Sequence, residues 1–169
     1  MMKVKDAISA RRSIRKYERK PIPADVLLDL LEAARQAPSS SNRQAWEIIV
    51  VTDQEMRDRL VPVSGNQKFI GKCSAYLVGV AEPKVGYSPI DVTIALDHLS
   101  LRAVELGLGT CWIGDFEPMR VKEILGIPID RDVPICMTLG YPSVTPAARR
   151  RKASSELFRR DRWDVRWGR

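Results

Sequence analysis

The chain has 169 residues, 44% of them hydrophobic and 29% charged, and we expect a single domain spanning 1–169. No apolar run approaches the roughly 20 residues that cross a bilayer, and the charged N-terminus lacks the apolar stretch of a secretory signal. We therefore expect a cytoplasmic chain with no membrane partner. The net charge of +7 resides mostly between Thr145 and Arg169, which hold nine basic and three acidic residues.

In the first half of the chain, apolar spacing and proline positions predict two helices. One covers 3–10, and the other begins at Pro23 and stops before Pro38. A polar loop follows over 38–45. The apolar run 46–51 is typical of a strand, and Thr52 or Asp53 can cap a helix that reaches about Leu60.

The second half continues the alternation of helices and short apolar strands. Strands are predicted over 75–81 and 133–139, and helices over 91–108 and 118–125, the second closed by Gly126. Such interleaving indicates an α/β or α+β fold.

The last segment, 145–169, is polar and basic but contains two tryptophans, Trp163 and Trp167. Polar segments of this kind are often disordered. Because it carries large aromatic side chains, we expect this tail to dock on a partner subunit.

The residues that usually carry chemistry are scarce. The one histidine, His98, lies inside a predicted helix and is expected to pack or face solvent, and no metal site is expected. Cys73 and Cys136 lie in or beside apolar runs and should act as small hydrophobes. The sequence also has no nucleophile elbow, Walker loop or dinucleotide-binding glycine motif. If the protein is an enzyme, a bound cofactor should supply its reactive centre.

Four segments suit a cofactor that carries a phosphate. Arg11, Arg12, Ser13 and Arg15 offer guanidinium groups and a hydroxyl, which bind phosphate well. The basic run 149–152 could join them or remain a solvated charge run. The loop 38–44 could hold a ring edge or merely connect two elements, and in the stretch 107–115, Cys111 and Trp112 could pack near a flat ring or fill core.

Four segments together resemble the nitroreductase family of FMN-dependent oxidoreductases in its shorter form. They are 11–17 (RRSIRKY), 37–46 (APSSSNRQAW), 106–114 (LGLGTCWIG) and 139–142 (LGYP) followed by the basic run. The resemblance implies an α+β fold with a central, mostly antiparallel sheet flanked by helices. It also implies a homodimer with FMN sites at the interface, and the C-terminal tail would extend onto the partner.

The resemblance further implies which residues bind the cofactor. Arg11, Arg12, Ser13 and Arg15 would hold the flavin phosphate and pyrimidine edge. The loop, which in the family usually contributes across the dimer, would supply Pro38, Ser39, Ser40 and Asn42. Trp112, Ile113 and Gly114 would lie along the flavin ring. Arg150 and Lys152 would complete the phosphate site, in a register uncertain by one residue. The chain departs from the family at Ala45, commonly proline, and at Ile48, commonly aromatic. It also has a short 81–91 segment, which suggests an open active site.

The expected function is hydride transfer from NADH or NADPH, through FMN, to a small electron acceptor such as a nitroaromatic or quinone. No side chain is assigned as a catalytic acid or base. The same fold could instead support dehalogenation, enone reduction or consumption of the flavin, or could bind flavin without turnover. A nucleic-acid-binding module that uses the basic tail is a further alternative, disfavoured because the charge is confined to that tail.

Overall fold

A computed structural model describes residues 2–168. Its centre is a four-stranded sheet in the order β1-β2-β4-β3, formed by β1 (Trp46–Val51), β2 (Ala75–Ala81), β4 (Asp132–Gly140) and β3 (Gly109–Ile113). Every neighbouring pair is antiparallel. All seven residues of β2 are buried, as expected for a central strand covered on both faces. The expected α+β fold with an antiparallel sheet is confirmed.

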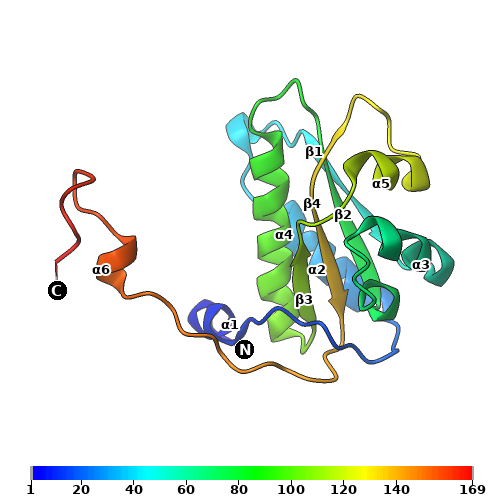
Figure 1. Cartoon of the computed structure of the whole chain (residues 1–169), viewed down its shortest axis with the longest axis horizontal. Coiled ribbons are helices and arrows are strands. Elements are labelled where there is room, and N and C mark those ends of the chain that lie inside the picture. Colours follow the sequence, from blue (N-terminus) through cyan, green and yellow to red (C-terminus); the bar gives the residue numbers. More distant parts are fainter. Residues whose placement is uncertain (1, 169) are drawn as a thin grey trace.

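Helices cover both faces of the sheet (Figure 1). On one face, α2 (Ala24–Arg35) and α4 (Ser88–Glu105) pack Leu30, Leu96 and Leu99 against the sheet. On the other, α3 (Gln54–Val63) and α5 (Pro118–Leu125) supply Leu60 and Val121. The short helix α1 (Val4–Ala10) contacts α4. The molecule is therefore a three-layer arrangement with one hydrophobic cluster on each side of the sheet.

The helix ends follow local chemistry. The Asp53 side chain accepts a 2.8 Å hydrogen bond from the Met56 amide and caps α3. Gly126 ends α5 with a φ of 67°, a left-handed conformation that glycine adopts without steric cost. Helix α4 begins at Ser88, three residues before the predicted start, because Pro89 occupies its first turn. β3 was not predicted as a strand.

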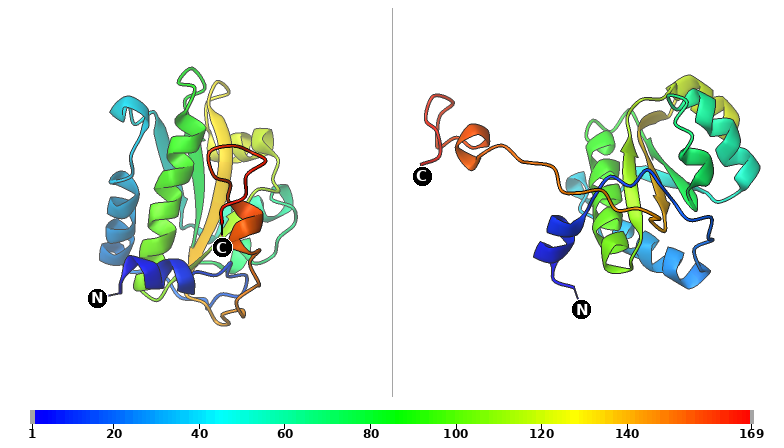
Figure 2. Two further views of the ribbon diagram at one scale, coloured as in Figure 1. Left: turned by 90° about the vertical axis from the view of Figure 1, so that its left-hand side faces the viewer. Right: turned by 60° about the horizontal axis from the view of Figure 1, so that its bottom comes forward.

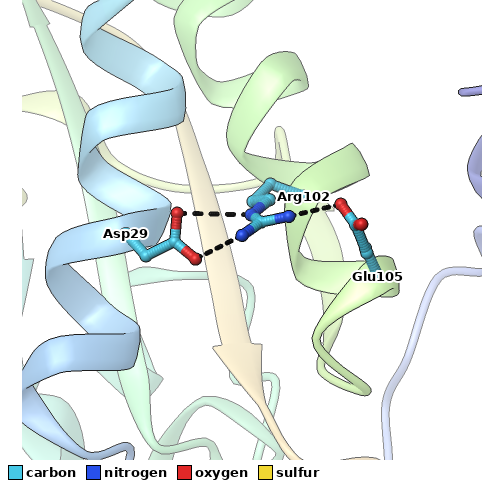
Figure 3. A network of polar contacts seen from close by, with 3 residues as sticks. All are labelled: Asp29, Arg102 and Glu105. Atoms are coloured by element: carbon cyan, nitrogen blue, oxygen red, sulfur yellow. Dashed lines mark hydrogen bonds and ion pairs between the residues drawn. The ribbon is translucent and has the colours of Figure 1, made fainter. Parts of the chain in front are cut away.

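A polar network ties α2 to the C-terminal end of α4 (Figure 3). Arg102 donates to both carboxylate oxygens of Asp29, at 3.3 and 2.5 Å, and to Glu105 on its own helix. This two-pronged geometry fixes the guanidinium more firmly than a single contact would. The network holds the last turns of α4 in place beside α1.

The C-terminal residues form an arm that leaves the rest of the molecule (Figures 1 and 2). Within it, α6 (Ser154–Leu157) is followed by a turn closed by an antiparallel backbone bridge between Arg159 and Arg166. The Arg159 guanidinium lies 5.2 Å from the centre of the Trp163 ring. Its large apolar side chains remain exposed, Trp163 by 84% and Phe158 and Trp167 by 56% each. No helix in the described part of the chain is both long and apolar enough to cross a membrane.

Candidate functional site

The segment that follows α1 runs beside the free edge of β3. Ser13 forms a parallel bridge with Thr110, and the Ile14 amide donates to the Thr110 carbonyl at 2.9 Å. Ile14 is almost fully buried and lies directly over Gly109, where a Cβ atom would sit 2.3 Å from Ile14 Cγ1. The close approach of the two backbones fixes the direction in which the neighbouring arginines project.

The chain that leaves β4 returns to the same segment. Tyr17 bridges Pro142, and the Ser143 amide donates to the Lys16 carbonyl at 3.0 Å. The Tyr17 hydroxyl also forms a buried 2.7 Å hydrogen bond with Thr138 Oγ1 in β4. These contacts place the basic run after residue 145 beside the arginines that follow α1.

A cleft of about 600 Å³ lies between these two segments. Its walls include all four residues predicted in the first segment, Arg11, Arg12, Ser13 and Arg15, together with Arg149 and Arg151 of the second. No carboxylate belongs to the described residues that line it. Five guanidinium groups around one open cleft form a strongly positive site suited to a phosphate.

The second basic segment reaches the cleft through residues adjacent to the predicted ones. Arg149 and Arg151 line the cleft, whereas the predicted pair, Arg150 and Lys152, is not found among its described lining residues. Alternate residues of an extended segment point in opposite directions. Which of these four residues bind a phosphate stays a prediction, and the lining of the cleft favours Arg149 and Arg151.

The guanidinium groups are not equally available. Arg12 Nη1 donates to the carbonyls of Ser9 and Arg11 at 2.7 and 2.8 Å, so this side chain is partly held in its own segment. For the side chains of Arg11 and Arg15, the structure records no hydrogen bond or ion pair with a described residue. These two have donors free for a ligand.

Cys111 lies behind the cleft and is 1% exposed. Burial raises the pKa of its thiol, an effect that the nearby positive charge of Arg15 opposes. The thiol therefore stays protonated at neutral pH and is a core residue rather than a nucleophile. In the two residues that follow it in sequence, Trp112 is half-buried against the cluster beneath α2 and α4, and Ile113 is fully buried. Ile113 could reach a ligand only through its backbone, whereas the Cα of Gly114 faces open space.

The loop that holds the predicted residues Pro38, Ser39, Ser40 and Asn42 lies at the N-terminal end of α4, whereas α1 and the arginine cleft lie near its C-terminal end (Figure 2). The Ser40 amide donates to both carboxylate oxygens of the buried Asp91, at 3.2 and 3.1 Å, which anchors the loop to the first turn of α4. From Asp91 to Glu105 the helix rises about 21 Å at ~1.5 Å per residue. One chain therefore does not bring the loop and the arginine cleft together.

The loop itself is built in an unusual conformation. Ser41, Asn42 and Gln44 all have positive φ values between 51° and 54°, a region that residues other than glycine adopt at a cost. The Gln44 amide donates to Ser39 Oγ at 3.0 Å and closes the turn. Asp91 was not predicted as a residue of the site; the signal that could have found it is its place as the acid in the first turn of the longest helix.

Adding a methyl group at Gly109 tests how the cleft is positioned. Gly109→Ala is expected to lower the free energy of unfolding by about 1–3 kcal/mol, because overpacking forces Ile14 and β3 apart, and to weaken binding of anions at the cleft. Denaturant unfolding measures the first effect. Gly86→Ala, where an added Cβ meets no atom within 4 Å, is the control. Equal unfolding midpoints for both variants would contradict the close packing of Ile14 on Gly109.

Within residues 2–168 no group of three histidine, cysteine or acidic side chains is arranged to hold a metal ion.

Comparison with known proteins connects this architecture to other chains. The nitroreductase family model matches residues 8–82 and 63–141. A relative from Archaeoglobus fulgidus, named for NADH dehydrogenase and NAD(P)H nitroreductase activity, is 35% identical over 144 residues, covering 80% of this chain and 83% of the relative. The NADPH-flavin oxidoreductase of Vibrio harveyi is 30% identical over 164 residues, which cover 86% of this chain and 68% of that protein. The solved FMN-dependent nitroreductase of Clostridium difficile superimposes with a TM-score of 0.85 at 28% identity, covering 93% of this chain and 98% of that chain.

Proposed function

This chain belongs to the nitroreductase family, and on that premise we propose that it is an FMN-dependent oxidoreductase that uses NADH or NADPH to reduce a small-molecule acceptor such as a nitroaromatic or quinone. Relatives are named as NADPH-flavin oxidoreductase and as FMN reductase. The observation that carries the proposal is the cleft in which Arg11, Arg15 and three further arginines converge without a carboxylate.

The donors in this cleft fit the phosphate of FMN. Arginine side chains bind phosphate oxygens in pairs of parallel hydrogen bonds, and Arg11 and Arg15 have their donors free. Ser13 adds a hydroxyl at the same wall. We assign Arg149 and Arg151, rather than Arg150 and Lys152, to the second side of the phosphate.

The residues along β3 would position the flavin ring and would take no part in the reaction themselves. Bound FMN would supply the centre that accepts and donates hydride, and no described residue of the cleft is assigned as an acid or base. The open side of Gly114 leaves room for a flat ring to approach the backbone. Arg15 would stabilise negative charge at the edge of the reduced ring. The loop residues Pro38, Ser39, Ser40 and Asn42 would contact it from another chain.

Three observations support a homodimer. The loop and the arginine cleft are separated along α4, so two chains related by a twofold axis could combine them. Helix α4 exposes Ile90 by 55%, and with α1 it forms an apolar hollow of about 310 Å³ that Leu101 and His98 help to line. The exposed aromatic arm supplies a third surface that would be covered by a partner.

The alternatives share the fold but differ in the reaction. Dehalogenation, enone reduction, consumption of the flavin, or flavin binding without turnover would all use the same phosphate site. A nucleic-acid module is disfavoured, because Arg149 and Arg151 line a cleft instead of a flat exposed surface.

The proposal is tested by a visible absorbance spectrum of the purified protein, with the released cofactor identified after denaturation. We expect a yellow protein that releases about one FMN per chain, one for each phosphate site, and that oxidises NADH or NADPH when a nitroaromatic or quinone is added. A colourless protein that cannot be reconstituted with FMN would overturn the assignment. Bound FMN without turnover would leave only the binding function.

A further inference from the structure

A second positive cleft lies at the end of the sheet where β1 finishes and β2 begins. It has a volume of about 270 Å³ and lies between residues 19–22, the start of α3 and residues 72–75. None of its lining residues belongs to the arginine cleft described above. It is therefore a separate site on the same chain.

Four of its lining residues are cations, Arg19, Lys20, Arg57 and Lys72, and no described carboxylate lines it. Arg19 and Lys72 are exposed at its rim. Lys20 Nζ lies 4.3 Å from the centre of the Tyr141 ring, so its charge is held at one side of the opening. The electrostatic potential inside should favour an anion.

The floor of the cleft carries a charge that the protein leaves without a counter-ion. Arg57 is only 7% exposed, and no described carboxylate forms an ion pair with it. One Nη atom donates to the Thr52 carbonyl and the other to Gln54 Oε1 at 2.8 Å, while Nε has no partner. A buried cation is costly unless an opposite charge accompanies it, and these bonds leave guanidinium donors unused.

Neighbouring contacts hold this guanidinium in one orientation. Gln54 Nε2 donates to the Gly71 carbonyl at 2.8 Å and to Asp58 Oδ1 at 3.0 Å, so the amide that accepts from Arg57 is itself fixed. A binding group that is already oriented loses little conformational entropy when a ligand arrives. Arg57 is therefore preorganised as an anion-binding residue.

Besides the cations, the lining of the cleft includes the apolar residues Ile22, Leu27 and Ala75, which we call its apolar wall. We propose that the cleft binds a small phosphate monoester, with its phosphate on Arg57 and its organic group against Ile22 and Leu27. Arg19 and Lys72 contribute to the phosphate from the rim. The volume lies just below the roughly 300–1,000 Å³ of pockets for drug-sized ligands, which suits a compact molecule.

The test uses full-length protein loaded with FMN, so that the first cleft is occupied, and phenyl phosphate as the probe in titration calorimetry. We expect saturable binding of the probe. Absorbance should show that the flavin is not released. Arg57→Met should weaken binding by about tenfold or more, since hydrogen bonds between charged groups are the strong ones. Arg19→Gln combined with Lys72→Gln should weaken binding of phenyl phosphate several-fold. Because both residues are exposed, this double variant should fold even if Arg57→Met does not.

The matched control is Arg59→Gln combined with Lys68→Gln, which removes the same charge from exposed residues nearby that do not line the cleft. Its affinity should equal that of the unmodified protein. Absence of saturable binding, displacement of flavin by the probe, or an equal loss in the control pair would each overturn the proposal. Inorganic phosphate that binds as tightly as phenyl phosphate would overturn the role of the apolar wall.

Discussion

Arg15→Ala is expected to lower the affinity for FMN by about ten- to a hundredfold, the effect of losing a charge-assisted contact to phosphate or to the ring edge. Arg15 lines the arginine cleft, and its guanidinium makes no recorded bond within the described protein that would compete with the ligand. FMN affinity is measured by fluorescence titration of the apoprotein. Any flavin that the variant still binds should also be reduced more slowly by NADH or NADPH, because the charge near the reduced ring is gone.

The neighbouring Lys16 provides the control for this experiment. Lys16→Ala removes the same charge from an exposed residue that does not line the cleft, so its effect on FMN affinity should be small. Equal affinities for Arg15→Ala and the unmodified protein, with equal rates of flavin reduction, would remove Arg15 from the site.

Replacing the aromatic residues of the arm is expected to break the proposed dimer. In the triple variant Phe158→Ser, Trp163→Ser and Trp167→Ser, the dimer dissociation constant should rise by at least about a hundredfold, because buried aromatic anchors dominate the stability of protein interfaces. The substitutions leave Arg149 and Arg151 in place, so a loss of FMN in this variant would follow from dissociation. Sedimentation velocity over a range of protein concentrations measures the change.

The control for the arm removes apolar side chains from the opposite side of the molecule. Met119 and Ile129 are exposed by 55% and 70% and belong to α5 and the turn that follows it. Met119→Ser combined with Ile129→Ser should leave the sedimentation coefficient unchanged. A triple arm variant that sediments as the unmodified protein does would show that the arm does not hold the partner.

Much of the fold follows from local patterns, and the exception is informative. The apolar runs 46–51, 75–81 and 133–139 and the amphipathic helices are determined by spacing alone, and the structure contains all of them. β3 was missed because Gly107 and Gly109 are typical of a turn, and because its pairing with β4 and Ser13 comes from distant parts of the chain. Tertiary contacts, rather than propensity, make these residues a strand.

The site divides in a similar way. The residue types in Arg11–Arg15 indicated phosphate, and the structure places all the predicted members of this segment around one cleft. The register of the second basic group depends on how residues 145–151 leave β4, which no local pattern encodes. Arg57 was overlooked because a single arginine on an amphipathic helix looks like a surface charge until its burial is known.

The separation of the loop and the cleft along α4 also decides how two damaged chains would behave together. In the proposed homodimer each site combines the cleft of one chain with the loop of the other. A chain with Arg15→Ala is impaired in the cleft, and a chain with Ser40→Pro is impaired in the loop, because proline lacks the amide that donates to Asp91. The two chains are then each impaired alone but complementary. When equal amounts reassociate at random, about a quarter of all sites contain both intact parts. Mixing the two impaired preparations should therefore raise the activity above that of either one, as in complementation between alleles of one gene.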